Sequence, residues 1–174
     1  MDLNEFQTTR DMIDVALNKA GWNVKNLAQV QVEVDTKQSD FVKHHYKDVD
    51  ETLKNDLESK YADYLLLDDT GGPLAIIEAK RTSKDPLLAA QTQARLYAED
   101  IFNQTGKNVF IFLSNGYEIY YWNYPHEDPR LLKAFLTKDD LEKRKWINEN
   151  KLDLSKVEIN KNIVDRSKSI ESCK

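Results

Sequence analysis

Hydrophobic and polar residues repeat with two different periods along the chain, and each period predicts one kind of secondary structure. Over residues 4–20 the apolar positions recur at helical spacing, with Asn4 as the N-cap and Gly21 as the stop. The apolar stripe of this helix consists of Phe6, Met12, Ile13, Ala16, Leu17 and Ala20. Residues 30–34 alternate between valine and polar residues, which predicts a half-buried strand. Residues 36–60 are polar and charged, with a short helix predicted over 49–57.

The next two apolar runs, residues 61–67 and 74–80, flank a cluster of Asp, Thr, Gly and Pro residues and predict a β-hairpin. If the turn is centred between Thr70 and Gly71, Asp63 lies directly opposite Glu78. Because side chains alternate along a strand, Asp63 then shares a face with Glu78 and Lys80. Two carboxylates that face each other on paired strands repel, so a nearby cation would stabilise this pair.

The rest of the pattern predicts one long helix, two further strands and a last helix. Asp85 caps a helix that starts at Pro86, reaches about residue 103 and stops by Gly106. Residues 109–113 are a continuous apolar run, as in a strand buried on both faces, and residues 117–122 are an aromatic, alternating strand. Residues 124–136 are predicted to be a connector, and Thr137 caps a charged helix to about residue 148. The predicted fold class is α/β, a mixed central sheet flanked by helices.

Composition narrows the class of protein. The chain has 174 residues, 40% hydrophobic and 32% charged, which suits one soluble domain with a sizeable core. Its formal net charge of −5 argues against a generic DNA-coating protein but does not exclude a nuclease with an acidic metal site. No apolar run approaches the roughly 20 residues that span a bilayer, and no signal-peptide pattern is present. The single cysteine, Cys173, fits a reducing compartment, so we expect a cytoplasmic protein.

Asp63, Glu78 and Lys80 together have the chemistry of a divalent-metal site. Mg²⁺ prefers oxygen ligands and keeps several waters, so two carboxylates and one backbone carbonyl are a sufficient protein share. We expect Asp63 and Glu78 to bind the ion with the carbonyl of Ala79, and Lys80 to orient or activate the attacking water. The competing interpretation is a cross-strand charge cluster without a ligand. The apolar residues around the acids argue against it, since unpaired buried carboxylates are costly.

The Asp…Glu-x-Lys pattern resembles the core of PD-(D/E)XK nucleases, and the helix that follows narrows this resemblance. Gln93-x-x-x-Tyr97 resembles a QxxxY element found after the catalytic core of several nuclease families, including the restriction (R) subunit of type I restriction-modification enzymes. Further stretches resemble the N-terminal nuclease domain of that subunit, in the same order: Thr9-Arg10-x-x-Ile13-Asp14, Ala20-Gly21-Trp22, Ala62-Asp63-Tyr64, Glu78-Ala79-Lys80, Ser114-Asn115-Gly116, Tyr121-Trp122, and Pro129-Arg130 with Phe135-x-Thr137. The resemblance covers roughly residues 5–145.

This resemblance implies a restriction-endonuclease-like fold and a metal-dependent endonuclease that hydrolyses DNA without sequence preference of its own. It implies catalytic roles for Asp63, Glu78, Lys80, Gln93 and Tyr97, and Mg²⁺ or Mn²⁺ as the cofactor. It implies DNA as a partner, together with the modification (methyltransferase) and specificity subunits of a restriction-modification complex.

The resemblance also implies how the chain is organised. Residues 1–150 are expected to be the nuclease domain, and residues 151–174 a linker or the start of a helicase-like motor in a longer chain. ATP binding and translocation would belong to that motor, because no GxxxxGK[ST] phosphate loop occurs in these 174 residues.

Two stretches depart from the family pattern. The family places an acidic residue close before the Thr-Arg pair, whereas only Glu5 stands near it here. Glu5 suits the first turn of a helix for electrostatic reasons, and a metal or DNA-proximal role is the alternative. Near the C-terminus, Lys168 and Ser169 replace the Tyr and Gln of the usual lead-in to the motor.

Two other functions stay open. The chain could be a nuclease of the same fold from another DNA repair or defence system. It could also be a catalytically silent DNA-binding or assembly module, although the presence of Asp63, Glu78 and Lys80 favours an enzyme.

Overall fold

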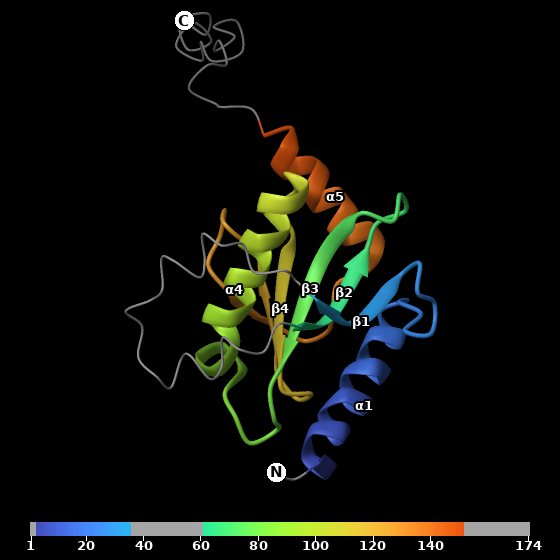
Figure 1. Ribbon diagram of the computed structural model, residues 1–174, viewed down its shortest axis with the longest axis vertical. Coiled ribbons are helices and arrows are strands. Elements are labelled where there is room, and N and C mark those ends of the chain that lie inside the picture. Colours follow the sequence, from blue (N-terminus) through green and yellow to red (C-terminus); the bar gives the residue numbers. More distant parts are fainter. Residues whose placement is uncertain (1–2, 36–60, 152–174) are drawn as a thin grey trace, which may run out of the picture. The chain divides into compact units, whose positions relative to one another are not determined.

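A computed structural model of the chain describes residues 3–35 and 61–151, without the side chains of 3–6, 34, 35 and 61. Residues 1–142 form one compact unit, which contains the sheet, and residues 143–174 form a second. The helices and strands of the described part are shown in Figure 1. In chain order they are α1 (Leu3–Lys19), β1 (Val30–Asp35), β2 (Tyr61–Leu67), β3 (Pro73–Ala79), α4 (Pro86–Thr105), β4 (Phe110–Ser114), β5 (Ile119–Trp122), β6 (Arg130–Leu132) and α5 (Lys138–Glu149).

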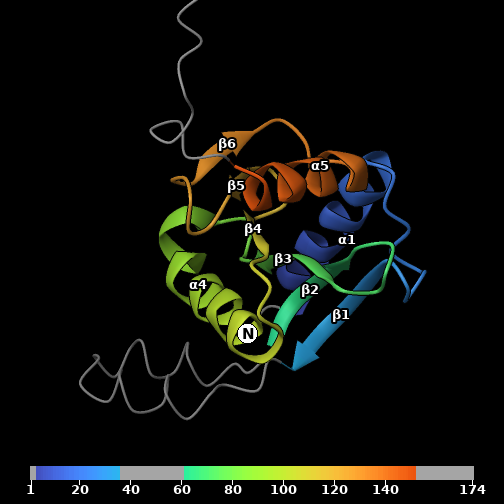
Figure 2. The same ribbon diagram turned by 90° about the horizontal axis from the view of Figure 1, so that it is seen from above.

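All six described strands belong to one mixed sheet, whose spatial order follows the chain from β1 to β6. β3 and β4 are parallel, and every other neighbouring pair is antiparallel. Parallel neighbours need a crossover connection, which α4 supplies between β3 and β4. In Figure 2, α4 lies on one face of the sheet and α1 on the other. The predicted fold class, a mixed α/β sheet flanked by helices, is therefore confirmed.

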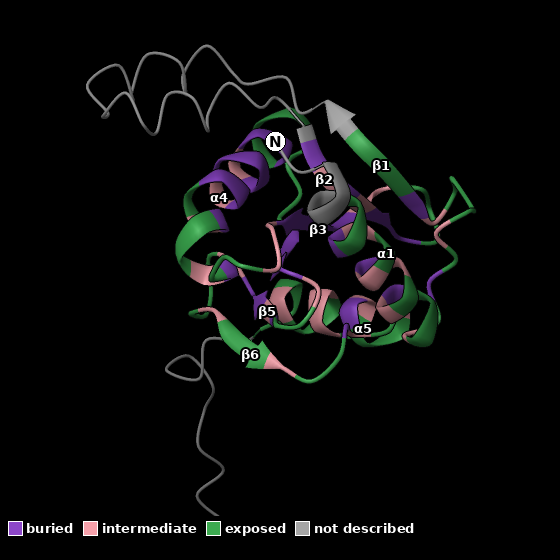
Figure 3. Ribbon diagram, turned by 90° about the horizontal axis from the view of Figure 1, so that it is seen from below, coloured by how far each residue is buried: buried purple, intermediate pink, exposed green. Residues whose placement is uncertain are grey.

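Each face of the sheet has its own apolar core. Ile13 and Leu17 of α1 belong to one core, and Ala90 and Ala94 of α4 belong to the other. β3 and β4 contribute to both cores, because alternate side chains point to opposite faces of a strand. Every residue of β4 is buried, as predicted for this apolar run. The edge strands β1 and β6 are mostly exposed (Figure 3).

The turn between β2 and β3 is organised by Asp68. Its Oδ1 accepts hydrogen bonds from the backbone N–H groups of Thr70 and Gly72, at 3.0 and 2.7 Å, and from the Thr70 hydroxyl at 2.6 Å. Gly71 adopts φ +76°, which glycine reaches without steric cost. The sequence Asp-Asp-Thr-Gly-Gly therefore closes the hairpin with local hydrogen bonds of its own.

The pairing of β2 with β3 is the one that the turn position predicts. Tyr64 pairs with Ile77 and Leu65 with Ile76, so Asp63 lies opposite Glu78. A shift between Leu66 and Leu67 is confined to the turn end of the hairpin and leaves this pairing unchanged.

The predicted ends of α4 are also confirmed. Asp85 has an extended backbone, and its carboxylate accepts hydrogen bonds from the N–H groups of Leu87 and Leu88. Gly106 ends the helix in the left-handed conformation, φ +70°. Thr137 caps α5 in the same manner as Asp85 caps α4, because its hydroxyl accepts from the N–H of Asp140 at 3.1 Å.

Some expectations were wrong. Residues 124–136 are not only a connector, since they contain β6, whose three residues are too few to show a period. Val32 is 41% exposed although the alternation predicted it to be buried, because β1 pairs with β2 alone among the described strands. Helix α1 begins at Leu3, so Asn4 lies inside the helix and is not its N-cap. β3 spans 73–79 and β5 begins at Ile119, each displaced from the predicted bounds by one or two residues.

Several expectations fall on residues outside this description. They are the short helix over 49–57, the linker from residue 152 onward with the motor lead-in and Cys173, and the side-chain roles of Glu5 and Phe6.

Candidate active site

Three carboxylates occupy matching positions on three adjacent strands. The β2–β3 pairing places Asp63 opposite Glu78. On the other side, Val32 pairs with Tyr64 and Val34 with Ala62, so Glu33 of β1 lies opposite Asp63. Glu33 has φ +54°, a strained backbone for a residue other than glycine. The sheet therefore carries a row of acids from its edge to its centre.

Asp63 is nearly buried and its two oxygens have different partners. Its side chain is 13% exposed. Oδ2 accepts a 2.8 Å hydrogen bond from the N–H of Ala79, and Oδ1 lies 3.4 Å from Nη2 of Arg10 on α1. Burial raises the pKa of Asp63, and the Ala79 N–H and Arg10 act in the opposite direction by stabilising the ionised form. A cation close to Oδ1 thus offsets part of the cost of burying this charge.

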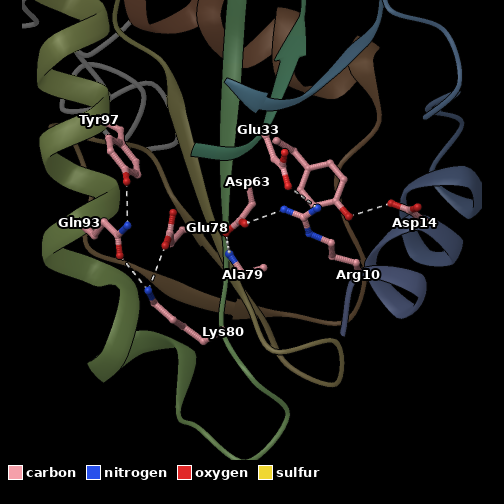
Figure 4. Close-up of polar contacts among 10 residues, drawn as sticks. Arg10, Asp14, Glu33, Asp63, Glu78, Ala79, Lys80, Gln93 and Tyr97 are labelled. Atoms are coloured by element: carbon pink, nitrogen blue, oxygen red, sulfur yellow. Dashed lines mark hydrogen bonds and ion pairs between the residues drawn. The ribbon is translucent and has the colours of Figure 1, made fainter. Parts of the chain in front are cut away.

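Glu78 begins a chain of polar contacts that ends inside the α4 core. Its side chain is 4% exposed, and its Oε1 lies 3.0 Å from Nζ of Lys80. Nζ also donates to Oε1 of Gln93 at 2.8 Å, and Nε2 of Gln93 donates to the hydroxyl of Tyr97 at 2.7 Å. Figure 4 shows this chain extending from β3 toward α4, with Asp63 next to Ala79 and Arg10 reaching Asp63 from the side of α1.

Local structure brings these residues together. Lys80 directly follows β3, and its backbone N–H still donates to the carbonyl of Ser114 on β4 at 2.8 Å, which extends the parallel pairing. Gln93 and Tyr97 are four residues apart in α4 and therefore lie on one helical face. The connection to α4 is held in turn by Asn115, whose side-chain amide donates to the carbonyl of Lys84 at 2.9 Å.

Helix α1 contacts two successive residues of β2. Arg10 reaches Asp63, and Asp14, one turn later, accepts a 2.8 Å hydrogen bond from the hydroxyl of Tyr64. Nη1 of Arg10 also forms a 2.9 Å ion pair with Glu33. Arg10 thus bridges two members of the acidic row.

All five residues predicted to be catalytic lie at this place, in two groups around Ala79. Sequence reasoning left Arg10 open between a role on the helix surface and a metal-site or DNA-proximal role, and it missed Glu33 as a member of the site. The Thr9-Arg10 element was visible in the sequence, but the residues that Arg10 contacts were not. Glu33 gave no signal, because it looked like one polar position of an alternating strand.

The donor set suits a hard cation with few protein ligands. No group of three or more His, Cys, Asp or Glu side chains in the described part of the chain is arranged to hold a metal ion. Asp63 and Glu78, at opposing positions of β2 and β3, offer two carboxylates, a protein share with which Mg²⁺ can keep waters and substrate phosphates. The contribution of the Ala79 carbonyl stays a prediction.

Comparison with known proteins identifies the family. Residues 2–130 match the family model described as the N terminus of the type I restriction enzyme R protein. The chain belongs to this family. A search among curated proteins gave no match.

A solved structure supports the same assignment. It is the fragment structure of a putative HsdR subunit of a type I restriction enzyme from Vibrio vulnificus YJ016, with 25% sequence identity and a TM-score of 0.51. The alignment covers 84% of this chain and 26% of that one, so the chain spans about a quarter of the solved fragment. The R-protein family and this similarity fit a restriction-endonuclease-like fold. No described helix is long and apolar enough to cross a membrane.

Proposed function

We propose that this R-protein N-terminal domain is a metal-dependent endonuclease that hydrolyses DNA phosphodiester bonds without sequence preference of its own. The observation that carries the proposal is the pairing of Asp63 with Glu78 on adjacent strands, beside the ammonium group of Lys80. Arg10 and Lys80 compensate for the two nearly buried charges in the metal-free chain, and a divalent ion could take over part of that role. A divalent ion held there would polarise the phosphate of a phosphodiester and so favour its hydrolysis.

Each side chain has a role that follows from its contacts. Asp63 and Glu78 would hold Mg²⁺ or Mn²⁺, which supplies Lewis-acid stabilisation of the phosphate and of the leaving oxygen. An ammonium group has three N–H donors, and Lys80 directs two of them to Glu78 and Gln93. The third can donate to a phosphate oxygen or to the attacking water. Gln93 and Tyr97 act as positioning residues, since they reach the site through Lys80.

The family suggests the setting of this reaction. We propose that the domain works in a longer R protein, where an ATP-driven translocase moves the DNA. Modification (methyltransferase) and specificity subunits would supply recognition of the DNA sequence, and the complex would be cytoplasmic.

A plasmid-nicking assay tests the proposed function. The purified chain is incubated with supercoiled DNA and Mg²⁺ or Mn²⁺, with EDTA as the metal-free control. We expect nicked product only with the ion. Lys80→Ala, purified in parallel to exclude a contaminating nuclease, should be at least about a hundredfold slower. Product that survives this substitution would contradict the assignment, and no metal-dependent product from either the chain or its ATP-supplied parent complex would favour a catalytically silent module.

Two variants of α4 test the positioning role. Tyr97→Phe removes one hydrogen bond to Gln93 and keeps the buried ring, so we expect a loss of a fewfold in kcat. Gln93→Ala removes the contact with Lys80 itself and should cost about tenfold or more in kcat, with KM for DNA nearly unchanged. A larger effect on KM than on kcat for both variants would indicate DNA contacts instead.

A further inference from the structure

Arg10 connects two neighbouring members of the acidic row. Its guanidinium lies 2.9 Å from Glu33 and 3.4 Å from Asp63, and its side chain is 18% exposed. Both contacts come from one face of α1, across the edge strand and its neighbour. Arg10 therefore provides a resident positive charge next to a carboxylate that is proposed to bind a metal ion.

The two contacts of Arg10 are unequal. The bond to Glu33 has a normal length for a charged pair, whereas 3.4 Å to Asp63 is at the long end of the range. Glu33 is also the more exposed carboxylate, with 64% of its side chain accessible. Arg10 is thus anchored mainly at the edge of the sheet and reaches Asp63 with its second nitrogen.

The contacts of Asp63 indicate which of its oxygens can exchange partners. Oδ2 is held by the N–H of Ala79, within the β2–β3 hairpin. Oδ1 faces Nη2 of Arg10. Oδ1, which Arg10 contacts, is therefore the oxygen at which another cation could replace the guanidinium.

We propose that Arg10 is a positioning residue that stands in for the divalent cation at Asp63 in the metal-free chain. When the ion binds, the guanidinium gives up Asp63 and stays on Glu33. This inference rests on the proposed metal-dependent function. It adds that Arg10 limits metal binding, because the ion must compete with the guanidinium for Asp63. Glu33 has no contact with the ion in this scheme and acts only as the anchor of Arg10.

This arrangement keeps the metal-free site close to electrical balance. Asp63 and Glu78 each have a basic partner, Arg10 and Lys80, so neither nearly buried carboxylate depends on the ion for its folded position. The same partner lowers the affinity of Asp63 for the ion, since like charges repel at short range. Arg10 therefore stabilises the metal-free fold and weakens binding of the ion.

Mn²⁺ binding to the 174-residue chain, measured by electron paramagnetic resonance without DNA, tests the proposal. We expect Arg10→Gln to bind Mn²⁺ about tenfold more tightly than the wild type, because one repelling charge is gone. Arg10→Lys, which keeps the charge, should stay closer to the wild type. Glu33→Gln should bind several-fold more weakly, because Arg10 then has Asp63 as its main carboxylate. Circular dichroism checks the fold, and Glu33 is exposed enough for its variant to remain testable if Arg10→Gln does not fold.

The double variant Arg10→Gln/Glu33→Gln separates an anchor from a ligand. If Glu33 acts through Arg10, its substitution has little effect when Arg10 is already replaced. Equal weakening in both backgrounds would make Glu33 a direct ligand and overturn the proposal, as would unchanged or weaker binding by Arg10→Gln.

Asp63→Asn distinguishes failure of this inference from failure of the function. If the wild type binds Mn²⁺ and Asp63→Asn does not, the metal site stands whatever the Arg10 variants show. If neither the wild type nor Arg10→Gln binds Mn²⁺, both the proposed metal site and the proposed role of Arg10 are wrong.

Discussion

Asp63→Asn will slow metal-dependent DNA cleavage by about a thousandfold or more. Asparagine has nearly the same shape and can still accept the hydrogen bond from the N–H of Ala79. It lacks the negative charge that would hold the ion and that now faces Arg10. The expected loss is therefore chemical and not a loss of folding. Initial rates of plasmid nicking at saturating Mg²⁺ give the measurement, and the thermal midpoint gives the check on the fold.

Asp69→Asn is the matched control on the same hairpin. Asp69 lies in the exposed turn and forms an ion pair with Lys138, away from the acidic row. We expect its cleavage rate to stay within about twofold of the wild type, because an exposed ion pair contributes little. Wild-type cleavage by Asp63→Asn would place the active site elsewhere on the chain.

Phe112→Ala will destabilise the domain by about 3–5 kcal/mol. Phe112 is fully buried in the central strand β4, with ring centroids 5.5 Å from Tyr121 and 5.2 Å from Phe135. Truncation removes these contacts and leaves a cavity between β4, β5 and the segment before α5. Urea denaturation followed by circular dichroism measures the change in the free energy of unfolding.

Phe102→Ala makes the same chemical change at a different depth. Phe102 lies near the end of α4 and is 45% exposed. Its truncation should cost less than about 1 kcal/mol, because nearly half of its surface is already in contact with water. Similar losses for the two variants would mean that β4 is not the centre of the core.

The sequence was informative where structure depends on neighbours along the chain. The alignment of Asp63 with Glu78 follows from the turn at Thr70 and Gly71 and from strand alternation, both of which are local. The ends of α4 follow from Asp85 and Gly106 for the same reason. The resemblance implied a role for Gln93 at the site but not its contact with Lys80, 13 residues away, which depends on how α4 packs against β3.

The sequence was uninformative where distant segments must dock. Arg10 is 23 residues from Glu33 and 53 from Asp63, and no periodicity specifies which turn of α1 meets which strand. The exposure of Val32 depends on β1 being at the edge of the sheet, which is a property of the whole strand order. The strand β6 was missed because its three residues pair with β5 without a pattern of their own.

The two contacts of α1 with β2 together define the position of the helix along the strand. Arg10 and Asp14 are one helical turn apart, and their partners, Asp63 and Tyr64, are consecutive in the strand. Sliding the helix by the rise of a single residue, about 1.5 Å, would lengthen or misalign both contacts at once. The tyrosine thereby helps to set the axial position of the Arg10 guanidinium, with which it also interacts electrostatically. A residue outside the reaction thus sets where the charge beside Asp63 stands.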